Sequence, residues 1–284
     1  MTETQGNRYT LEVLDNGVVS FRHTQTGEIL HGSVGPEKEA TELYIDASGL
    51  GKCGKSEVVV FDVGTGCGAQ LMALIDFLKT SQSVQEIHVY SFDLEKEGLR
   101  AALEARKQFA SVERNHLFLE KSLSENSFTW KCGENKNFHW KFIGGDFRET
   151  IRSLRDKEPQ LKADFIFYDF FSPASHPWLW TFELFQMLHS YCKETTHLVT
   201  YSSATCVKAA LVAAGWFVGT TIPSGKKAQS IFAAGSSGEV ANLLPRKFIS
   251  TFSLSQKPFC DAETPESQLE IRKRLLAHPQ FSEG

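Results

Sequence analysis

A glycine-rich segment holds the residues whose types and spacing are best suited to ligand chemistry. An apolar run, residues 57–63, ends beside Asp62 and leads into a loop made of Gly64, Thr65, Gly66 and Gly68. Glycines at alternating positions let a backbone turn pass close to a ligand, because they have no Cβ and accept positive φ angles. The segment therefore predicts a loop that binds a nucleoside-type cofactor.

Acidic residues follow the next predicted strands. In an open α/β sheet, ligands bind outside the carboxyl ends of the strands. Asp93 is predicted there to accept hydrogen bonds from two ribose hydroxyls, with Glu95 as the alternative. Asp146, after a Gly-Gly turn, is predicted to bind an adenine amino group. A helix cap is the structural alternative for both aspartates.

A second informative segment follows the predicted strand 164–169. Asp169 is followed by an aromatic, proline-stiffened loop that includes Phe171, Pro173, Trp178 and Trp180. Aromatic side chains in a loop can stack on a nucleobase, since every base offers a π face. A purely structural role, burying the loop against the body, is the alternative, and it is the favoured one for Trp180.

The order of elements predicts a parallel, doubly wound α/β sheet, because strands and helices alternate after residue 50. Predicted strands are residues 57–63, 86–92, 138–143, 164–169, 197–201, 216–222 and 230–234. Predicted helices are 37–50, 68–79, 96–109, 147–156, 183–191, 205–214 and about 266–277. The short connection 223–227 implies one antiparallel strand. The polar segment 113–137 is expected to be an irregular insertion or a long hairpin.

An N-terminal hairpin is predicted from residues 9–13 and 18–22, which flank Asp15-Asn16-Gly17. The expected domains are residues 1–50, a hairpin and helix packed on the core; 51–236, the Rossmann-like domain; and 237–284, a C-terminal extension.

Composition limits the class of protein. The 284 residues are 41% hydrophobic and contain no apolar run of the roughly 20 residues that a membrane span needs. The N-terminus lacks the pattern of a signal peptide, so a cytoplasmic location is expected. Six scattered cysteines form no C-x-x-C pair, and neither a metal site nor a disulfide framework is expected.

The net charge of −4 is not typical of a nucleic-acid-binding domain. Basic residues nevertheless concentrate near the C-terminus. They are Lys226, Lys227, Arg246, Lys247 and the run 272–274. They could form one positive surface, although each alone is equally compatible with an ordinary solvated charge.

Taken together, these motifs resemble the methyltransferase domain of the MnmC family, bacterial proteins that modify the wobble uridine of tRNA. The resemblance covers about residues 31–235. It is most specific in Asp169-Phe170-Phe171-Ser172-Pro173-Ala174, Pro177, Trp180-Thr181 and Thr200-Tyr201-Ser202-Ser203-Ala204, and extends to the glycine loop, Ser91-Phe92-Asp93, Gly145-Asp146 and Gly225-Lys226-Lys227.

The resemblance implies a Rossmann-like class I methyltransferase fold and S-adenosyl-L-methionine as cofactor. The implied reaction converts 5-aminomethyl-uridine to 5-methylaminomethyl-uridine in the tRNA anticodon. Two-domain members of the family add a flavin oxidoreductase domain. This sequence has no second glycine fingerprint, so a stand-alone, flavin-free monomer that performs methyl transfer only is expected, with its aminomethyl substrate supplied by another enzyme.

Within this interpretation each site residue has an expected role. Asp169 is the catalytic residue, because a carboxylate can orient the attacking amine and take up its proton. Phe170, Phe171 and Pro173 form the wall that orients the base, and Tyr201 or, alternatively, Ser202 lends a hydroxyl to the substrate. The residues expected to contact tRNA phosphates are Lys226, Lys227, Arg246 and Lys247.

Three other functions stay open. The protein could methylate a small amine, which would need the same cofactor but no basic docking surface. It could instead be a non-catalytic cofactor- or RNA-binding protein on the same fold, although Asp169 argues against that. A nicotinamide dehydrogenase is disfavoured by the G-x-G-x-G spacing.

Overall fold

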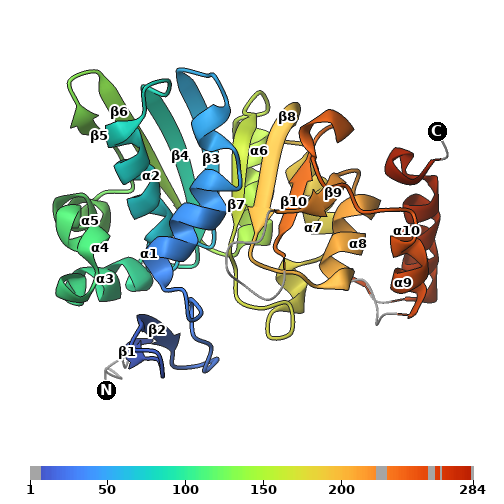
Figure 1. Ribbon diagram of the computed structural model, residues 1–284, viewed down its shortest axis with the longest axis horizontal. Helices are drawn as coiled ribbons and strands as arrows, with labels where there is room; N and C mark the ends of the chain where they lie inside the picture. Colours follow the sequence, from blue (N-terminus) through green and yellow to red (C-terminus); the bar gives the residue numbers. More distant parts are fainter. Residues whose placement is uncertain (1–7, 222–228, 255–259, 263, 283–284) are drawn as a thin grey trace. The chain divides into compact units, whose positions relative to one another are not determined.

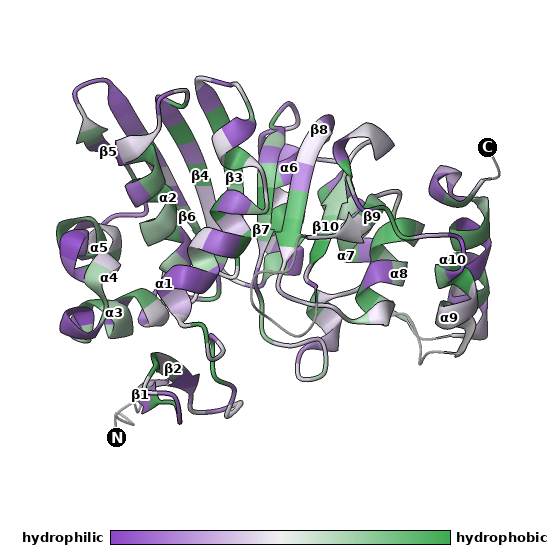
Figure 2. Cartoon of the chain, viewed as in Figure 1, coloured by the Kyte–Doolittle hydropathy of each residue, from purple (hydrophilic) through white to green (hydrophobic). Residues whose placement is uncertain are grey.

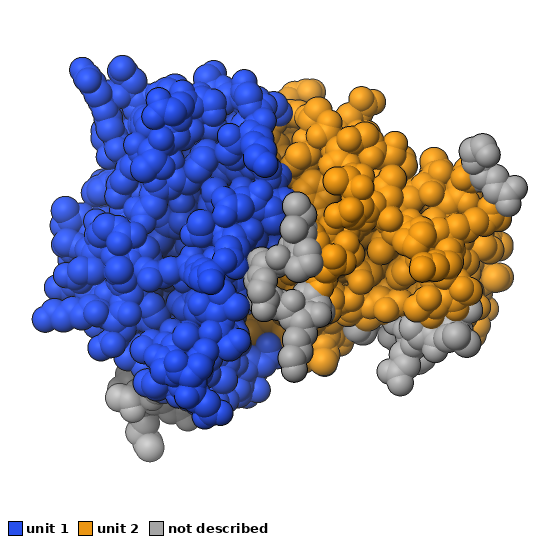
Figure 3. Space-filling model, viewed as in Figure 1, with its two compact units in different colours: residues 1–146 blue, residues 147–284 orange. Residues whose placement is uncertain are grey.

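A computed structural model describes residues 8–221, 229–254, 260–262 and 264–282. The chain divides into two compact units, residues 1–146 and residues 147–284 (Figure 3). This division does not follow the domains expected from the sequence, which stay a prediction.

Unit 1 begins with the predicted hairpin, β1 (Tyr9–Val13) and β2 (Val19–His23), which pair antiparallel with Leu11 opposite Phe21. In the connecting turn the N–H of Gly17 donates to the Leu14 carbonyl at 2.8 Å. Only Gly17 takes a positive φ there, 80°. The turn therefore depends on the glycine alone, whereas the sequence pattern Asn-Gly suggested positive angles at both positions.

Four strands form the sheet of unit 1 in the order β5-β6-β4-β3 (Figure 1). The strands β3 (Glu57–Val63), β4 (Glu86–Asp93) and β6 (Lys136–Gly144) are parallel, as predicted. The edge strand β5 (Ser127–Gly133) is antiparallel to β6. The hairpin interpretation of this region is confirmed.

The helical segments of unit 1 differ from the prediction in three places. Residues 37–50 are helical but of mixed type, 96–109 is interrupted, and the first half of 113–137 is helical, so that the predicted hairpin is confined to β5 and β6. The segments are α1 (Pro36–Glu39), a π-helix (Ala40–Asp46), 3-10 turns (Leu50–Lys52 and Arg106–Gln108), α2 (Ala69–Thr80), α3 (Glu97–Glu104), α4 (Ala110–Arg114) and α5 (His116–Ser124).

The two faces of this sheet differ in burial. In β4 the side chains of Ile87 and Val89 are buried, while the alternating Glu86, His88 and Tyr90 are only half-buried. Alternating hydrophilic and hydrophobic bands along these strands are visible in Figure 2. Since successive side chains of a strand point to opposite faces, one face belongs to the core and the other is largely polar.

Unit 2 contains a sheet in the order β7-β8-β10-β9. The strands β7 (Ala163–Tyr168) and β8 (Cys192–Thr200) are parallel, whereas β10 (Ile231–Ala234) is antiparallel to both β8 and β9 (Phe217–Thr220). Thus β10 is the antiparallel strand that the sequence predicted. The prediction of only one such strand missed β5.

Helices surround the strands of unit 2, and α8 lies deepest, with six buried residues. Its neighbours are α7, α9 and α10. The side-chain amide of Gln280 exchanges hydrogen bonds with the backbone of Val218 at 2.7 and 2.8 Å, which protects the edge strand β9. The helices are α6 (Phe147–Lys157), α7 (Phe182–His189), α8 (Thr205–Ala213), α9 (Phe248–Leu254) and α10 (Pro265–Ala277), with 3-10 turns at Pro177–Leu179, Ser237–Glu239 and Pro279–Phe281.

The predicted α/β class with mainly parallel strands is confirmed. Among the described residues, no helix combines the length and apolar character that crossing a membrane requires.

Close backbone packing holds α3 against the glycine loop of unit 1. A Cβ built on Gly98 would lie 2.2 Å from the carbonyl oxygen of Gly66 and 3.2 Å from the N–H nitrogen of Cys67. Because these contacts are backbone atoms of the loop, a side chain at Gly98 must move either the loop or the helix.

We therefore expect Gly98→Ala to lower the thermal midpoint of unfolding and to weaken cofactor binding. Alanine normally favours a helix interior over glycine by about 1 kcal/mol, whereas overpacking costs typically about 1–3 kcal/mol. Differential scanning calorimetry gives the sign of the change. Gly133→Ala is the matched control, since its Cβ would make only ordinary contacts at 3.6 Å or more. An unchanged or raised midpoint for Gly98→Ala would contradict this expectation and show that the glycine loop can move aside at little cost in free energy.

Candidate active site

The glycine loop of unit 1 has the strained backbone that its sequence predicted. Gly64, Gly66 and Gly68 have φ angles of 85°, 52° and 79°, in the region that residues with a Cβ rarely adopt. The N–H of Gly64 donates to the Phe92 carbonyl at 2.9 Å. The loop thus turns directly from β3 into α2 beside the end of β4.

Asp93, the last residue of β4, holds this loop in place. Its Oδ2 accepts from the N–H of Gly66 at 2.8 Å, and its Oδ1 accepts from the N–H of Leu94 at 2.7 Å. Burial raises the pKa of the Asp93 carboxyl to about 6 in spite of these hydrogen bonds. The N-cap of α3 is Lys96, so the helix-cap alternative does not apply to Asp93. A carboxylate oxygen has two acceptor sites, and ribose binding by Asp93 stays a prediction.

Glu95, the alternative to Asp93, is engaged differently. Its carboxylate pairs with the guanidinium of Arg8, whose Nε also lies 3.4 Å from Glu97 Oε2. The next residue, Tyr9, is half-buried, and partial burial is the main cause of its raised pKa, followed by the charge of Asp93. The start of the N-terminal hairpin therefore lies against the acidic segment after β4, a contact that the sequence did not predict.

Asp62 forms a buried network beneath the loop. Its Oδ2 accepts from the hydroxyl of Thr65 at 3.0 Å and from that of Ser91 at 2.8 Å, and the indole N–H of Trp140 donates to Ser91 at 2.9 Å. Burial raises the pKa of Asp62 to about 6. Its Oδ1 is buried and has no hydrogen-bond partner among the described residues. The Thr65 side chain, predicted to bind cofactor, therefore supports the loop from within.

Asp146 lies at the end of β6, half-buried and directly before α6. The preceding Gly145 has a φ of 127°, and its N–H donates to the Asp93 carbonyl at 2.9 Å. This bond ties the end of β6 to the end of β4. The adenine-binding role of Asp146 stays a prediction.

In unit 2, Asp169 follows β7 directly and is half-buried. Backbone carbonyls of the next two residues are held by two aromatic side chains, the half-buried Tyr201 and the buried Trp180. The Tyr201 hydroxyl donates to the Phe170 carbonyl at 2.9 Å, and the Trp180 indole N–H donates to the Phe171 carbonyl at 3.0 Å. Tyr201, expected to contact substrate, thus fixes the loop after Asp169, and Trp180 is fully buried, as its structural alternative implied.

A row of stacked rings continues this loop. Phe171 stacks on His176 with ring centroids 5.0 Å apart, and His176 contacts the ring of Trp178 at 4.9 Å. Trp178 is 45% exposed, whereas Pro173 is half-buried. Sequence reasoning singled out Phe171 and Pro173 but not His176, although its position between Ser175 and Pro177 in an aromatic segment was a usable signal.

The structure thus assembles the predicted residues into two local groups. Unit 1 brings together the glycine loop and Asp93, with Asp146 connected through Gly145. In unit 2, Asp169 and Phe171 lie on the loop after β7, and Tyr201, which follows β8, is hydrogen-bonded to the Phe170 carbonyl of that loop. Lys226 and Lys227 lie outside the described residues.

Comparison with known proteins agrees with the interpretation of unit 1 and unit 2 as parts of a methyltransferase. Residues 113–236 match the family model described as S-adenosyl-L-methionine-dependent methyltransferase. The match covers less than half of the chain. The predicted cofactor, S-adenosyl-L-methionine, is confirmed by this match, and the nicotinamide alternative is not supported.

Individual relatives agree with the resemblance inferred from the sequence. The tRNA 5-methylaminomethyl-2-thiouridine biosynthesis bifunctional protein MnmC of Campylobacter hominis is 27% identical over 191 residues, which are 66% of this chain and 27% of that protein. The chain therefore spans little more than a quarter of the length of this curated relative. The resemblance to the methyltransferase domain of MnmC is confirmed.

Two solved structures share the fold. The crystal structure of MNMC2 from Aquifex aeolicus has a TM-score of 0.70 at 22% identity, covering 96% of this chain and 86% of that one. Spermidine synthase from Thermotoga maritima has a TM-score of 0.52 at 15% identity, covering 95% and 85%. The Rossmann-like methyltransferase fold predicted from the sequence is confirmed.

The residues of unit 1 fit the cofactor. S-adenosyl-L-methionine presents an ammonium group and ribose hydroxyls, which are hydrogen-bond donors. The unpartnered, buried Oδ1 of Asp62 and the carboxylate of Asp93 are acceptors beside a loop whose glycines leave room for a ligand. We propose that Asp93 and Asp62 accept hydrogen bonds from these donor groups of the cofactor.

We expect Asp93→Ala to weaken binding of S-adenosyl-L-methionine by about tenfold to a hundredfold, since a lost hydrogen bond to a charged group costs about 1.5–3 kcal/mol. Glu95→Ala is the matched control. Its carboxylate already pairs with Arg8, so a change of less than about fivefold is expected, because an exposed pair contributes at most about 1 kcal/mol. Isothermal titration calorimetry measures both, and a larger loss in Glu95→Ala would move the role to Glu95.

The pH dependence of the same titration is a second readout. Donor groups of the ligand favour the ionised carboxylate, so affinity should fall as the pH drops through the pKa of about 6. Linkage gives a loss of about tenfold between pH 7 and pH 5 for one proton. Affinity that is constant over this window would contradict the role of the buried carboxylates.

Proposed function

We propose that this protein transfers a methyl group to the exocyclic amine of 5-aminomethyl-uridine at the wobble position of tRNA. Asp169 and the aromatic loop that follows it carry the proposal. A carboxylate at the end of a strand, followed by stacked rings, offers an acceptor for an amine and a surface for a base. The named relative from Campylobacter hominis, which belongs to tRNA 5-methylaminomethyl-2-thiouridine biosynthesis, supports the choice of acceptor.

S-adenosyl-L-methionine supplies an electrophilic methyl group on a sulfonium. The attacking amine must be neutral, with its lone pair directed along the line of displacement. With the cofactor bound, the nitrogen would form the new N–C bond as the C–S bond breaks, with the bonding pair left on sulfur. Asp169 or water would take up the surplus proton of the nitrogen.

In this proposal Asp169 accepts a hydrogen bond from the amine and thereby directs the lone pair. The same negative charge stabilises the unreactive ammonium form, so a proton must be removed before attack. The rigid anchoring of the next carbonyls by Tyr201 and Trp180 limits the movement of Asp169. Tyr201 therefore acts as a positioning residue.

The stacked rings provide the surface for the base. Phe171 and His176 are in ring contact, and Trp178 presents nearly half of its surface to solvent. Base–aromatic stacking contributes about 1–3 kcal/mol per base. We propose that a splayed anticodon base binds along this row, with Pro173 stiffening the loop.

Basic residues in unit 2 suit a polyanionic partner. Arg246 and Lys247 are exposed before α9, and the residues at 272–274 are exposed on α10. Of these, Arg274 pairs with Glu270 at 2.8 Å. We propose that these residues, with Lys226 and Lys227, contact tRNA phosphates, that the protein acts as a monomer, and that it works in the cytoplasm, where tRNA is modified.

Methylation of a small amine is the second candidate. It would use the same cofactor and the same carboxylate but would gain nothing from the exposed Trp178 or from the basic residues. A preference for tRNA over a free amine therefore separates the two candidates.

We expect Asp169→Asn to lower the single-turnover rate of methyl transfer to tRNA containing 5-aminomethyl-uridine by about a hundredfold or more, the usual size of a general acid–base contribution. The amide keeps the size of the side chain and one acceptor but removes the charge. Quenched reactions followed by mass spectrometry of the nucleosides measure the rate.

The affinity for S-adenosyl-L-methionine should change less than about threefold in this variant, which serves as its own folding control. Ser203→Ala is the matched control variant, because Ser203 is exposed and follows Tyr201 by two residues. A rate for Asp169→Asn equal to that of Ser203→Ala would make Asp169 a structural residue and refute this mechanism.

A further inference from the structure

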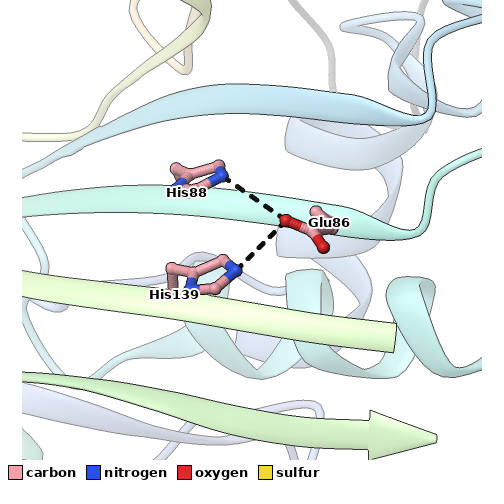
Figure 4. Close-up of side chains that lie close together, drawn as sticks. All are labelled: Glu86, His88 and His139. Carbon is pink, nitrogen blue, oxygen red and sulfur yellow. Dashed lines mark ion pairs between the residues drawn. The ribbon is translucent and has the colours of Figure 1, made fainter. Parts of the chain in front are cut away.

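Two histidines and a glutamate converge on the polar face of the sheet in unit 1. Glu86 and His88 are two residues apart on β4 and therefore lie on one face. His139 of β6 is the register partner of His88 in the parallel pairing of the two strands. Figure 4 shows the three side chains turned toward one another, with both imidazoles directed at the carboxylate.

The distances suit a shared ligand. The Oε2 atom of Glu86 lies 3.3 Å from Nε2 of His139 and 3.9 Å from Nε2 of His88. One atom from each side chain falls within 4.8 Å of the other two. Ligand atoms about 2.0–2.2 Å from a common metal ion are separated by such distances.

Neighbouring residues hold these side chains by their other polar atoms. The Thr129 hydroxyl lies 3.0 Å from Nδ1 of His139, and the Asn137 amide donates to Oε1 of Glu86 at 3.1 Å. Nε2 of His139 and Oε2 of Glu86 are thereby left to face each other. Partners of this kind on the distal atoms of ligating residues are typical of metal sites, where they fix the tautomer and the orientation.

The two imidazole nitrogens that face this group contact carboxylate oxygens. Nε2 of both histidines is buried and makes no hydrogen bond with the described residues, but Oε1 of Glu57 lies 2.9 Å from Nε2 of His88 and Oε2 of Glu86 lies 3.3 Å from Nε2 of His139. The two imidazole rings are stacked at 4.4 Å with an interplanar angle of 9°. Imidazole nitrogens and carboxylate oxygens therefore meet at one place, and together they are the donor set that a divalent transition-metal ion binds.

We propose that Glu86, His88 and His139 bind one divalent transition-metal ion of the Zn²⁺ class. Imidazole and carboxylate donors in this ratio favour Zn²⁺, Ni²⁺ or Co²⁺ over Mg²⁺, which prefers oxygen ligands alone. Glu57, beside His88, is the nearest further donor for a fourth position. None of these ligands is a cysteine. The expectation of no metal site rested on the absence of C-x-x-C pairs, and this site was therefore not predicted from the sequence.

The position of the group assigns the ion a structural role. Glu57 and Glu86 are the first residues of β3 and β4, whereas Asp93 is the last residue of β4. Seven residues of extended strand, roughly 23 Å at about 3.3 Å per residue, separate Glu86 from Asp93. The ion would cross-link β4 to β6, and to β3 through Glu57, far from the residues that hold the cofactor.

The test uses the full chain without a polyhistidine tag, freed of metal by chelator and dialysis. Zn²⁺ is titrated in competition with a chromophoric chelator, and Co²⁺ is titrated with its visible absorption as a report of the ligand set. One ion per chain is expected. His139→Gln and Glu86→Gln should weaken the affinity by about a hundredfold or more, and Thr129→Val by about tenfold to a hundredfold.

The matched control is His116→Gln, which removes a histidine of α5 outside the group and should leave the affinity unchanged. Saturating Zn²⁺ should raise the thermal midpoint of the parent chain but not that of His139→Gln. Binding of S-adenosyl-L-methionine shows whether each variant is folded. If His139→Gln and Glu86→Gln do not fold, the Zn²⁺ affinity of Thr129→Val tests the proposal.

Three results would overturn the proposal. They are the absence of stoichiometric Zn²⁺ binding, an affinity unaffected by both His139→Gln and Thr129→Val, and equally tight binding of Mg²⁺. Any of them would make the group an ordinary histidine–glutamate ion pair. None bears on methyl transfer, which is tested separately.

Discussion

The hydrogen bond from the N–H of Gly66 to the carboxylate of Asp93 is the interaction on which the geometry of unit 1 depends. It fixes a loop whose three glycines have positive φ angles and which would otherwise sample many conformations. The close packing of Gly98 on the carbonyl of Gly66 requires this loop position. The backbone carbonyl of Asp93 also accepts a hydrogen bond from the N–H of Gly145 at 2.9 Å. The loop and the start of α3 are therefore set by the Asp93 carboxylate, and the end of β6 is connected to the Asp93 backbone.

Partial or complete burial of the Asp62 and Asp93 carboxylates beside the glycine loop lowers the stability of the ligand-free fold at neutral pH. Burial raises the pKa of Asp62 and of Asp93 from 3.8 to about 6. The folded chain thus binds these protons more tightly than the unfolded chain. The corresponding stabilisation is complete below the unfolded value and is lost as the pH rises through about 6. At neutral pH both groups are ionised, and a ligand with donor groups can recover part of that cost, which couples cofactor binding to stability.

In unit 2, aromatic side chains hold the backbone beside Asp169 in position. The backbone after Asp169 is anchored at two successive carbonyls by aromatic side chains, Tyr201 and Trp180, whose rings are themselves packed 6.1 Å apart. Aromatic side chains combine a large buried surface with a polar atom that needs a partner. Here that polar atom holds the loop. Tyr201 and Trp180 belong to the motifs that resemble the MnmC family. Their role in holding the loop accounts for their presence in those motifs as well as contact with a substrate would.

Much of the fold could be predicted from local patterns. Strand β3 ends where the apolar run ends, and the glycine loop was recognisable from its spacing. In segment 113–137 the hairpin was one of two predicted alternatives, supported by the alternation of Phe128, Trp130 and Cys132 with Thr129 and Lys131, whereas the helix at His116–Ser124 was missed. The group of Glu86, His88 and His139 could not be predicted, because it depends on the register between β4 and β6. The hydrogen bond from the Thr65 hydroxyl to Asp62 could not be predicted either, because it depends on Asp62 being buried beneath the loop.

Methyl transfer to two acceptors tests the central claim most directly. The protein is incubated with S-adenosyl-L-methionine carrying a labelled methyl group, and either tRNA containing wobble 5-aminomethyl-uridine or the free 5-aminomethyl-uridine nucleoside is added at equal concentration. Transfer to the wobble nucleotide of the tRNA, with the free nucleoside unmodified or far slower, is the result predicted here. Equal methylation of the free nucleoside, or no transfer to the tRNA while the cofactor is bound, would contradict the account.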